Sequence, residues 1–175
     1  YQDKIQVIHD GIDTTTVAPN DSATFALPNG HELSRDDEVR TYVSRNLEPY
    51  RGFHSFMRAL PAILQARPNA QVVVVGGDLV SYGGKPKGGK SWRETLLAEI
   101  GPLPDRVHFT GRIPYAQYLA LLQVSSVHLY LTYPFVLSWS MLEAMSAGGF
   151  VIGSKTAPVE EVIQDGVNGW LVDFF

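Results

Sequence analysis

Short apolar runs alternate along this chain with segments whose apolar residues recur at the spacing of one helical face. The clearest run is 71–75 (QVVVV), an unbroken β-branched stretch of the kind found in strands that are buried on both sides of a sheet. In the segment before it, 52–66, apolar residues recur three or four positions apart, which favours an amphipathic helix. Alternation of this kind requires βαβ crossovers. The sequence therefore predicts an α/β fold, a doubly wound parallel sheet with helices on both faces.

The other expected elements continue the same alternation. Ser91 is followed three residues later by Glu94, a spacing that predicts a capping box and a helix ending near Ile100. Residues 4–9 are expected to form a strand or a linker, and the polar, turn-rich residues 14–38 a loop. Further strands are expected at 39–43, 107–109, 127–131, 150–153 and 170–172, and further helices at 114–123, 138–147 and 158–163.

Length and composition restrict the class of protein. A chain of 175 residues fits a single domain, expected to span 1–175. It has no cysteine, which excludes a disulfide scaffold, a Cys-ligated zinc site and a thiol nucleophile. Its five histidines show no H-E-x-x-H spacing, so no metal site is expected. A formal net charge of −4 argues against a nucleic-acid partner, and no apolar stretch is long enough to cross a bilayer.

In a doubly wound sheet, functional sites lie beyond the carboxyl ends of the strands. None of the segments that follow the expected strands carries G-x-G-x-x-G, which argues against a classical dinucleotide-binding fold. The segments in which a site is expected are 44–51, 76–90, 111–115, 132–138 and 154–161.

Two arginines, Arg45 and Arg51, lie between a buried strand and the helix expected at 52–66. Guanidinium forks bind phosphate oxygens in pairs, and the helix N-terminus beside them adds backbone N–H donors and the positive end of a dipole. The segment can therefore clamp a diphosphate. On these residues alone, pairing of each arginine with a local carboxylate such as Glu48, or simple exposure to solvent, is the slightly favoured interpretation.

Glu143 stands on a helix that is otherwise built of apolar and small residues. A carboxylate in such surroundings is costly unless it is paired or accepts hydrogen bonds, and paired sugar hydroxyls are suitable donors. A structural hydrogen bond or an exposed helix surface is the alternative, less favoured because a surface helix normally carries more than one charge. Ser138 has the residue type and position of an N-cap, where an anion would sit naturally.

Two further segments carry weaker signals. Lys85, Lys87 and Lys90 belong to a glycine-rich loop, for which a solvated, mobile loop is favoured over contact with an anionic substrate. The segment 111–115 follows a strand. Its backbone can meet the edge of a planar base, with Tyr115 near enough to stack on it.

Several ordered motifs occur together along the chain. Arg45 is followed by the pair Arg51 and Gly52, in the pattern R…[KR]-G. The segments 7–13 (VIHDGID), 109–114 (FTGRIP), 142–148 (LEAMSAG) and 165–172 (DGVNGWLV) are similar to V-I-x-N-G-[VI]-D, F-x-G-x-[VI]-[PS], L-E-A-M-A-x-G and D-G-x-N-G-x-L-V. Over nearly its whole length the chain thus resembles the C-terminal, donor-binding domain of GT-B glycosyltransferases of family 4, also called group 1. The resemblance implies a Rossmann-like sheet, with 1–13 as an interdomain linker.

The resemblance also implies roles for particular residues. Arg45, Arg51 and Glu143 take catalytic positions, with Glu143 as the second Glu of the family's E-x7-E motif, which binds the ribose. Phe135 stands where the first Glu would contact the transferred sugar, and Ser138 stands where a glycine meets the phosphate. The main chain of 109–114 receives the nucleobase. The expected substrate-binding set is Gly76, Gly77, Arg112, Ile113, Phe135, Val136, Leu137, Ser138 and Trp139.

The implied reaction moves a sugar, with retention of configuration, from a nucleoside diphosphate sugar to an acceptor hydroxyl. The arginines and a helix N-terminus would stabilise the leaving diphosphate, so neither a metal nor another cofactor is expected. The expected partners are the donor and the protein's own N-terminal domain, which is absent from this chain, so the fragment alone is expected to be inactive. A cytoplasmic location is expected, with peripheral membrane association of the full-length protein as an option. The alternatives are a non-catalytic nucleotide-sugar-binding or scaffolding module, and a plain domain without a site.

Overall fold

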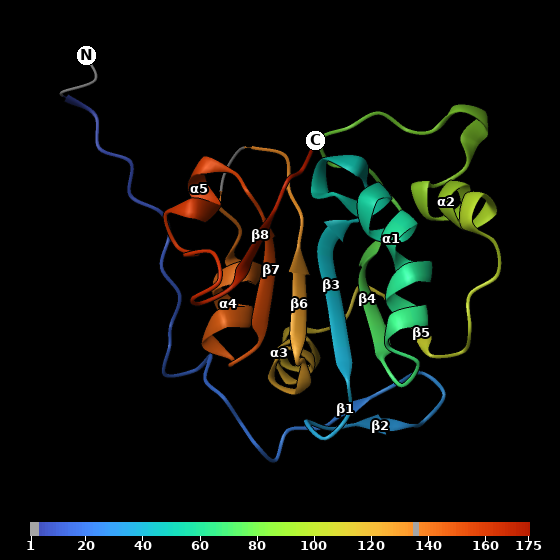
Figure 1. The fold of residues 1–175 in the computed structure, drawn as a ribbon, viewed down its shortest axis with the longest axis horizontal. Coiled ribbons are helices and arrows are strands. Elements are labelled where there is room, and N and C mark those ends of the chain that lie inside the picture. The colour runs from blue at the N-terminus through green and yellow to red at the C-terminus, as the bar shows by residue number, and fades with distance from the viewer. Residues whose placement is uncertain (1–3, 135–136) are drawn as a thin grey trace.

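The centre of the molecule is a parallel sheet (Figure 1), in a computed structural model that describes residues 4–134 and 137–175. Six strands pair in the order β5-β4-β3-β6-β7-β8, and every neighbouring pair is parallel. The chain builds the sheet outward from β3 to β5 and then in the other direction from β6 to β8, so the winding reverses between β3 and β6. The strands are β3 (Val39–Asn46), β4 (Gln71–Gly77), β5 (Val107–Gly111), β6 (Val127–Tyr130), β7 (Phe150–Ser154) and β8 (Trp170–Val172).

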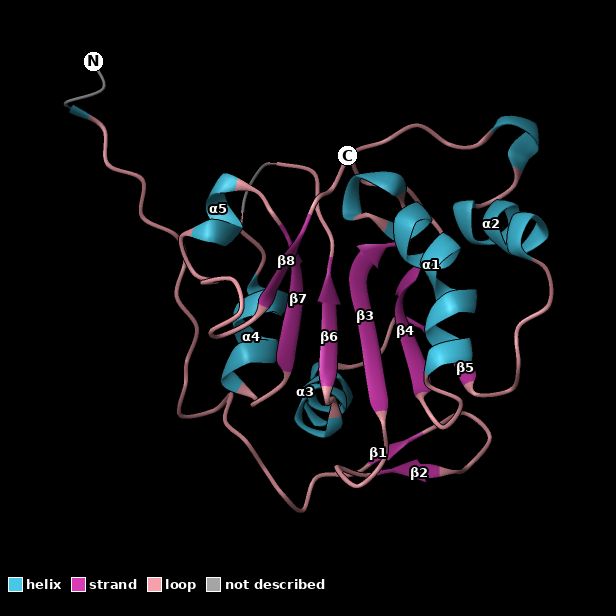
Figure 2. Cartoon of the chain, in the orientation of Figure 1, coloured by secondary structure: helices cyan, strands magenta, loops and turns pink. Residues whose placement is uncertain are grey.

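Helices cover both faces of the sheet, as predicted (Figure 2). α1 (Phe53–Ala66) and α2 (Trp92–Ile100) lie over β3, β4 and β5 on one face. α3 (Tyr115–Val124), α4 (Trp139–Ser146) and the short α5 (Ala157–Glu160) lie on the opposite face. This division is the one that right-handed crossovers produce when the winding reverses. None of the helices within 4–134 and 137–175 is long and apolar enough to span a membrane.

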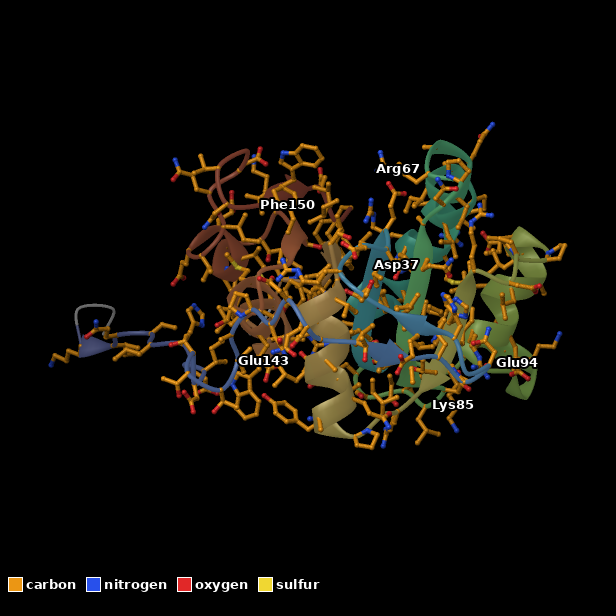
Figure 3. The ribbon with its side chains drawn as sticks, turned by 90° about the horizontal axis from the view of Figure 1, so that it is seen from below. Asp37, Arg67, Lys85, Glu94, Glu143 and Phe150 are labelled. Carbon is orange, nitrogen blue, oxygen red and sulfur yellow. The ribbon has the colours of Figure 1, made fainter. Side chains whose placement is uncertain are left out.

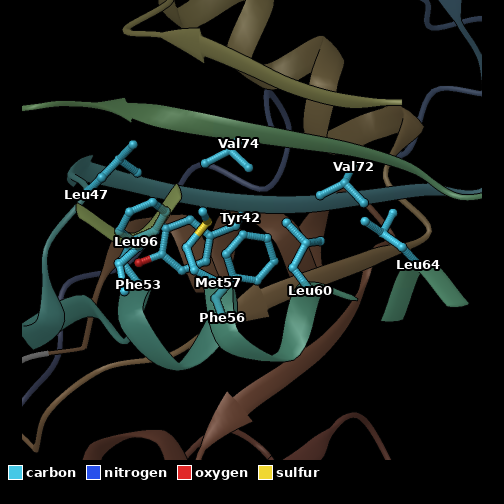
Figure 4. Close-up of a cluster of buried hydrophobic side chains, with 10 residues drawn as sticks. All are labelled: Tyr42, Leu47, Phe53, Phe56, Met57, Leu60, Leu64, Val72, Val74 and Leu96. Carbon is cyan, nitrogen blue, oxygen red and sulfur yellow. The ribbon is translucent and has the colours of Figure 1, made fainter. Parts of the chain in front are cut away.

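The unit formed by β3, α1 and β4 carries the core that fixes the position of the site (Figure 4). Val72 and Val74, alternate residues of β4, face the buried stripe of α1. Tyr42 of β3 stacks on Phe56 of α1, with ring centroids 4.8 Å apart. The Tyr42 hydroxyl donates a hydrogen bond to the backbone carbonyl oxygen of Arg51 at 2.6 Å. Burial of this stripe holds the start of α1 against the carboxyl end of β3. Its members are Phe53, Phe56, Met57, Leu60 and Leu64.

The prediction of a loop over 14–38 was wrong in part. This segment contains an antiparallel pair of two-residue strands, β1 (Phe25–Ala26) and β2 (Glu32–Leu33). Phe25 and Leu33 are paired in register and bury their side chains with residues of β3, β4 and α3. Strands of two residues are too short to show an alternating pattern in the sequence. These two form because their side chains are buried in the core.

Residues 4–9 were predicted to form a strand or a linker, and they form no strand. The segment projects from one side of the molecule (Figure 1), and Ile5, Val7 and Ile8 are exposed.

The remaining elements match the predicted ones within a few residues. The capping box of α2 is present, since the Ser91 hydroxyl accepts from the Glu94 backbone N–H and the Glu94 carboxylate accepts from the Ser91 backbone N–H. The strands β3 and β4 extend past their predicted ends, so more of their backbone reaches the site. Two short 3-10 turns, Pro49–Arg51 and Lys87–Gly89, lie in segments predicted to be loops.

Candidate functional site

Two hollows lie at the carboxyl ends of the strands, where the winding of the sheet reverses. The outer hollow, with a volume of ≈ 410 Å³, lies over the ends of β3 and β4 and the connection from β5 to α3. The inner hollow, with a volume of ≈ 170 Å³, lies over the ends of β3 and β6 and the start of α4. Val43, Ser44, Arg45 and Tyr118 line both, so the two form one groove. A doubly wound sheet places its ligand site at such a reversal.

The inner hollow contains both predicted arginines. Arg45 and Arg51 line it, and Arg45 also lines the outer hollow. Arg51 ends the 3-10 turn that leads into α1, so it lies beside the N-terminus of that helix. The structure therefore brings two guanidinium groups and the positive end of a helix to one small hollow, an arrangement that favours an anion.

Gly52 sets how closely α1 approaches the floor of the groove. It precedes α1 with a φ of 67°, in the left-handed region that favours glycine. A Cβ on Gly52 would lie 2.2 Å from the Cβ of Leu131, and Leu131 lines the inner hollow. Only a residue without a side chain lets the start of α1 pack against the segment that follows β6.

Glu48, the local carboxylate considered as a partner for the arginines, is completely buried. Its oxygens accept hydrogen bonds from the backbone N–H groups of Ser81, Tyr82 and Gly83 at 3.1 to 3.2 Å. The carboxylate therefore holds the backbone of the glycine-rich loop. Arg45 is exposed on the groove, as the solvent-exposed alternative expected.

The carboxylate of Glu143 (labelled in Figure 3) is held by two tyrosines of α3. Glu143 is only 9% exposed. Its Oε1 accepts a hydrogen bond from the Tyr115 hydroxyl at 2.9 Å, and its Oε2 accepts one from the Tyr118 hydroxyl at 2.7 Å. Burial and the bond to Glu143 raise the pKa of Tyr118, and the same two causes raise the pKa of Tyr115. Both phenols thus stay protonated as donors. The predicted need for donors is met by tyrosine hydroxyls, which lie on the wall of the outer hollow.

The outer hollow is shaped by glycines at the end of β4. Gly76 and Ile113 line it together with Arg112. A Cβ on Gly76 would lie 2.7 Å from a backbone oxygen of β3, and a Cβ on Gly77 would lie 2.9 Å from Oδ1 of Asn46. Arg112 donates a hydrogen bond to the same Asn46 oxygen at 3.0 Å. Gly76 and Gly77 therefore let β3 and β4 lie close together at the wall of the outer hollow. The hydrogen bond between Arg112 and Asn46 connects β3 to the segment that follows β5.

The start of α4 differs from the prediction in one respect. Ser138 lines the inner hollow and is the N-cap residue of α4, as predicted, but its side chain makes no cap hydrogen bond. The hydroxyl instead lies 3.1 Å from that of Ser140. Leu137 packs against the buried cluster that α3 and α4 form on their face of the sheet, and Trp139 is exposed. Neither residue lines the two hollows. The predicted site residues Phe135 and Val136 lie outside the described residues.

The lysines of the glycine-rich loop, Lys85, Lys87 and Lys90, are exposed, in line with the favoured interpretation of a solvated loop. In the part of the chain that the structure describes, no group of three or more His, Asp or Glu side chains could hold a metal ion.

Sequence reasoning missed Tyr118, which lines the groove, and the hydrogen-bonding roles of the buried residues Asn46 and Glu48. The spacing of Tyr115 and Tyr118 could have revealed the tyrosine pair, since residues three apart share one face of a helix. Asn46 and Glu48 carry no comparable signal, because their partners lie more than thirty positions away in the sequence.

Comparison with known proteins finds a family and several relatives to which this sequence is similar. A family model described as "Glycosyl transferases group 1" matches residues 28–175. The D-inositol 3-phosphate glycosyltransferase of Acidothermus cellulolyticus is 26% identical over 175 residues, which cover 98% of this chain and 37% of that protein. The chain therefore spans little more than a third of the length of this relative.

Solved structures that are similar to this one include the following two. The C-terminal domain of a glycosyl transferase group 1 family protein, LpcC from Francisella tularensis, superimposes with a TM-score of 0.70 at 19% identity, over 93% of this chain and 80% of that chain. Anabaena HepE, solved in complex with UDP and glucose, superimposes with a TM-score of 0.63 at 25% identity, over 78% of this chain and 35% of that chain.

Proposed function

Since the chain belongs to the glycosyl transferases of group 1 and has the Rossmann-like fold of a GT-B C-terminal domain, we propose that it is the donor-binding half of a retaining glycosyltransferase. Residues 1–175 form one nucleotide-sugar-binding domain in this proposal. The complete enzyme moves a sugar from a nucleoside diphosphate sugar to an acceptor hydroxyl. An N-terminal domain supplies the acceptor site, in keeping with a chain that covers 37% of its relative.

The observation that carries the proposal is the single groove formed by the two hollows. Arg45 and Arg51 line the inner hollow, and Arg51 lies beside the N-terminus of α1; these groups suit a diphosphate. The outer hollow has the more apolar walls and suits a nucleobase. Tyr118 lines both hollows and holds Glu143, so a ribose that joins the base to the diphosphate passes beside this pair.

The groove would promote the reaction mainly by electrostatic stabilisation. Negative charge develops on the leaving diphosphate as its bond to the sugar breaks, and fixed donors that meet this charge lower the barrier. In this proposal Arg45, Arg51 and the first N–H groups of α1 supply these donors, and no metal is needed. The chain by itself should show little or no turnover, because the acceptor side of the cleft belongs to another domain.

Calorimetric titration with UDP and with uridine tests the diphosphate site. Arg45→Ala and Arg51→Ala should each weaken UDP binding by roughly 10- to 150-fold, the equivalent of about 1.5–3 kcal/mol for a charge-assisted bond, and should leave uridine binding unchanged. Arg35→Ala is the matched control, since Arg35 pairs with Asp21 and lines neither hollow. Equal UDP affinity in wild type and both groove variants would refute the assignment. If binding holds but the chain joined to its N-terminal domain turns over no donor, the non-catalytic module is the better description.

A second titration tests the ribose contact at Glu143. UDP and its 2′-deoxy analogue are compared on wild type and on Glu143→Ala, because a site built for a hydroxyl penalises its absence. The deoxy analogue should bind less tightly to wild type, and the difference should largely disappear in the variant. Glu143→Gln, which keeps an acceptor oxygen, should fall between the two. An equal deoxy penalty in wild type and Glu143→Ala would show that Glu143 does not touch the ribose.

A further inference from the structure

Glu48 is a buried carboxylate with an unusual set of partners. It is 0% exposed, and an ionised carboxylate in such a place is costly unless hydrogen bonds replace its hydration. The replacements come from the backbone of one short segment. Oε1 accepts from the Ser81 N–H at 3.2 Å, while Oε2 accepts from the N–H groups of Ser81, Tyr82 and Gly83 at 3.1 to 3.2 Å. Three successive amides therefore converge on one side chain.

The same residue is tied to the start of α1. Its backbone carbonyl oxygen accepts from the Arg51 N–H at 3.1 Å, within the 3-10 turn that delivers Arg51 to the inner hollow. One residue thus fixes the turn through its main chain and the loop through its side chain. The loop is also held from two other directions, by a bond from the Asn46 side chain to the Ser81 hydroxyl at 2.7 Å and by one from the Trp92 indole N–H to the Gly84 carbonyl at 2.9 Å.

This anchoring places an aromatic ring on an arginine of the groove. The guanidinium carbon of Arg51 lies over the Tyr82 ring, 5.2 Å from its centroid, within the distance at which a cation is attracted to a π face. Tyr82 is one of the three residues whose amides Glu48 holds. Fixing its backbone therefore limits where its ring, and the guanidinium stacked on it, can lie.

We propose that Glu48 is a positioning residue, which fixes Ser81–Gly83 so that Tyr82 orients the Arg51 guanidinium toward the donor diphosphate. The inference rests on the proposed function, because it assigns Arg51 to the diphosphate. Glu48 is not a catalytic residue in this scheme, since it is fully buried and both of its oxygens face loop amides. The glycine-rich loop, for which a solvated, mobile loop is the favoured interpretation from the sequence, thereby becomes part of the phosphate end of the site.

Hydrogen exchange tests the anchor without any ligand. Glu48→Gln replaces the charged acceptor by a neutral amide, whose single carbonyl oxygen accepts more weakly from the loop amides and whose NH2 group cannot accept from them. Exchange at Ser81, Tyr82 and Gly83 should become faster by at least about tenfold, while the amides of β4 should exchange as in wild type. Unchanged exchange at the three loop amides would overturn the anchoring role.

Calorimetry tests the effect on phosphate recognition, with UDP and uridine as the two probes. Tyr82→Ala should weaken UDP binding by roughly 3- to 30-fold and leave uridine binding unchanged, and Glu48→Gln should shift it in the same sense. Tyr82→Phe, which keeps the ring, should bind UDP nearly as wild type does. Leu79→Ala is the control, an exposed side chain of the same loop, and should bind both probes normally.

An Arg51→Ala background separates positioning from a general effect of the loop. Tyr82→Ala should have no further effect on UDP binding there, because the group it orients is absent. An equal loss in both backgrounds would overturn the proposal while leaving the diphosphate site intact. If wild type itself failed to prefer UDP over uridine, the proposed function would fall and this inference with it, so the two failures give different results.

Discussion

Acidification should destabilise this fold, and the buried His128 should contribute a large part of the effect. His128 is completely buried in the sheet, where it pairs with Thr41 across β6 and β3. Its Nδ1 lies 2.9 Å from the Thr41 hydroxyl, which lies 2.8 Å from the Ser125 hydroxyl. Its Nε2 has no hydrogen-bond partner among the described residues. Burial lowers the pKa of His128 from 6.5 to about 4, because an imidazolium there would lose its hydration without compensation.

The two pKa values set the direction and the size of the effect. Between pH 4 and pH 6.5 the unfolded chain binds a proton that the folded chain excludes, so the free energy of unfolding rises with pH across this window. One pKa unit corresponds to about 1.4 kcal/mol, and the shift to about 4 therefore costs the fold about 3 kcal/mol when the pH falls from 7 to 4. A typical domain has only ~5–15 kcal/mol of stability, so the loss should be easy to measure.

Urea unfolding across this pH range, on wild type and on His128→Gln, isolates the effect. The glutamine side chain of the variant cannot titrate, and the carboxylates common to both proteins cancel when their stabilities are subtracted. His128→Gln starts less stable at pH 7, because its amide does not fit the site as the neutral ring does, but it should lose about 3 kcal/mol less than wild type on going to pH 4. His31→Gln, at an exposed position, should follow wild type. Parallel losses in wild type and His128→Gln, or an NMR pKa near 6.5 for His128, would refute the reasoning.

Three further changes test the local arguments. Gly52→Ala puts a Cβ 2.2 Å from that of Leu131 at a left-handed position, and urea unfolding should show a loss of at least about 2 kcal/mol. Ser91→Ala removes the capping box of α2; the same measurement should show a loss of about 1 kcal/mol, with UDP affinity unchanged. Tyr118→Phe deletes the hydroxyl that donates to Glu143 and leaves a buried acceptor short of a partner, so thermal unfolding should show a loss of about 1–3 kcal/mol.

Each of these three predictions has a result that would contradict it. Gly84→Ala, where a Cβ would meet no atom within 4 Å, should change stability by less than about 0.5 kcal/mol; a loss equal to that of Gly52→Ala would mean that crowding is not the cause. An unchanged urea midpoint in Ser91→Ala would show that the cap contributes nothing. For Tyr118→Phe, the same loss in a Glu143→Ala background would rule out the hydroxyl–carboxylate bond as its source.

Much of the architecture follows from local pattern. The β-branched run of β4 and the apolar stripe of α1 each express one periodicity over enough residues to be recognised. The capping box of α2 depends on two residues three positions apart, and it forms as predicted. The positions of Arg45 and Arg51 follow as well, because a parallel sheet brings the ends of its strands to one edge whatever their order.

Tertiary structure decided the order of the strands and the partners of the charged groups. The groove lies between β3 and β6, and this neighbour relation joins segments more than eighty residues apart. The strands β1 and β2 exist because Phe25 and Leu33 find a place in the core, not because of any local pattern. A buried carboxylate must have donors, and the sequence establishes that need for Glu143. Which donors meet it depends on where the folded backbone carries distant residues: for Glu143 they are two tyrosines of another helix, and for Glu48 three amides of a loop. The local sequence shows that a buried carboxylate needs hydrogen-bond donors, but only the packing of the whole chain brings those donors to it.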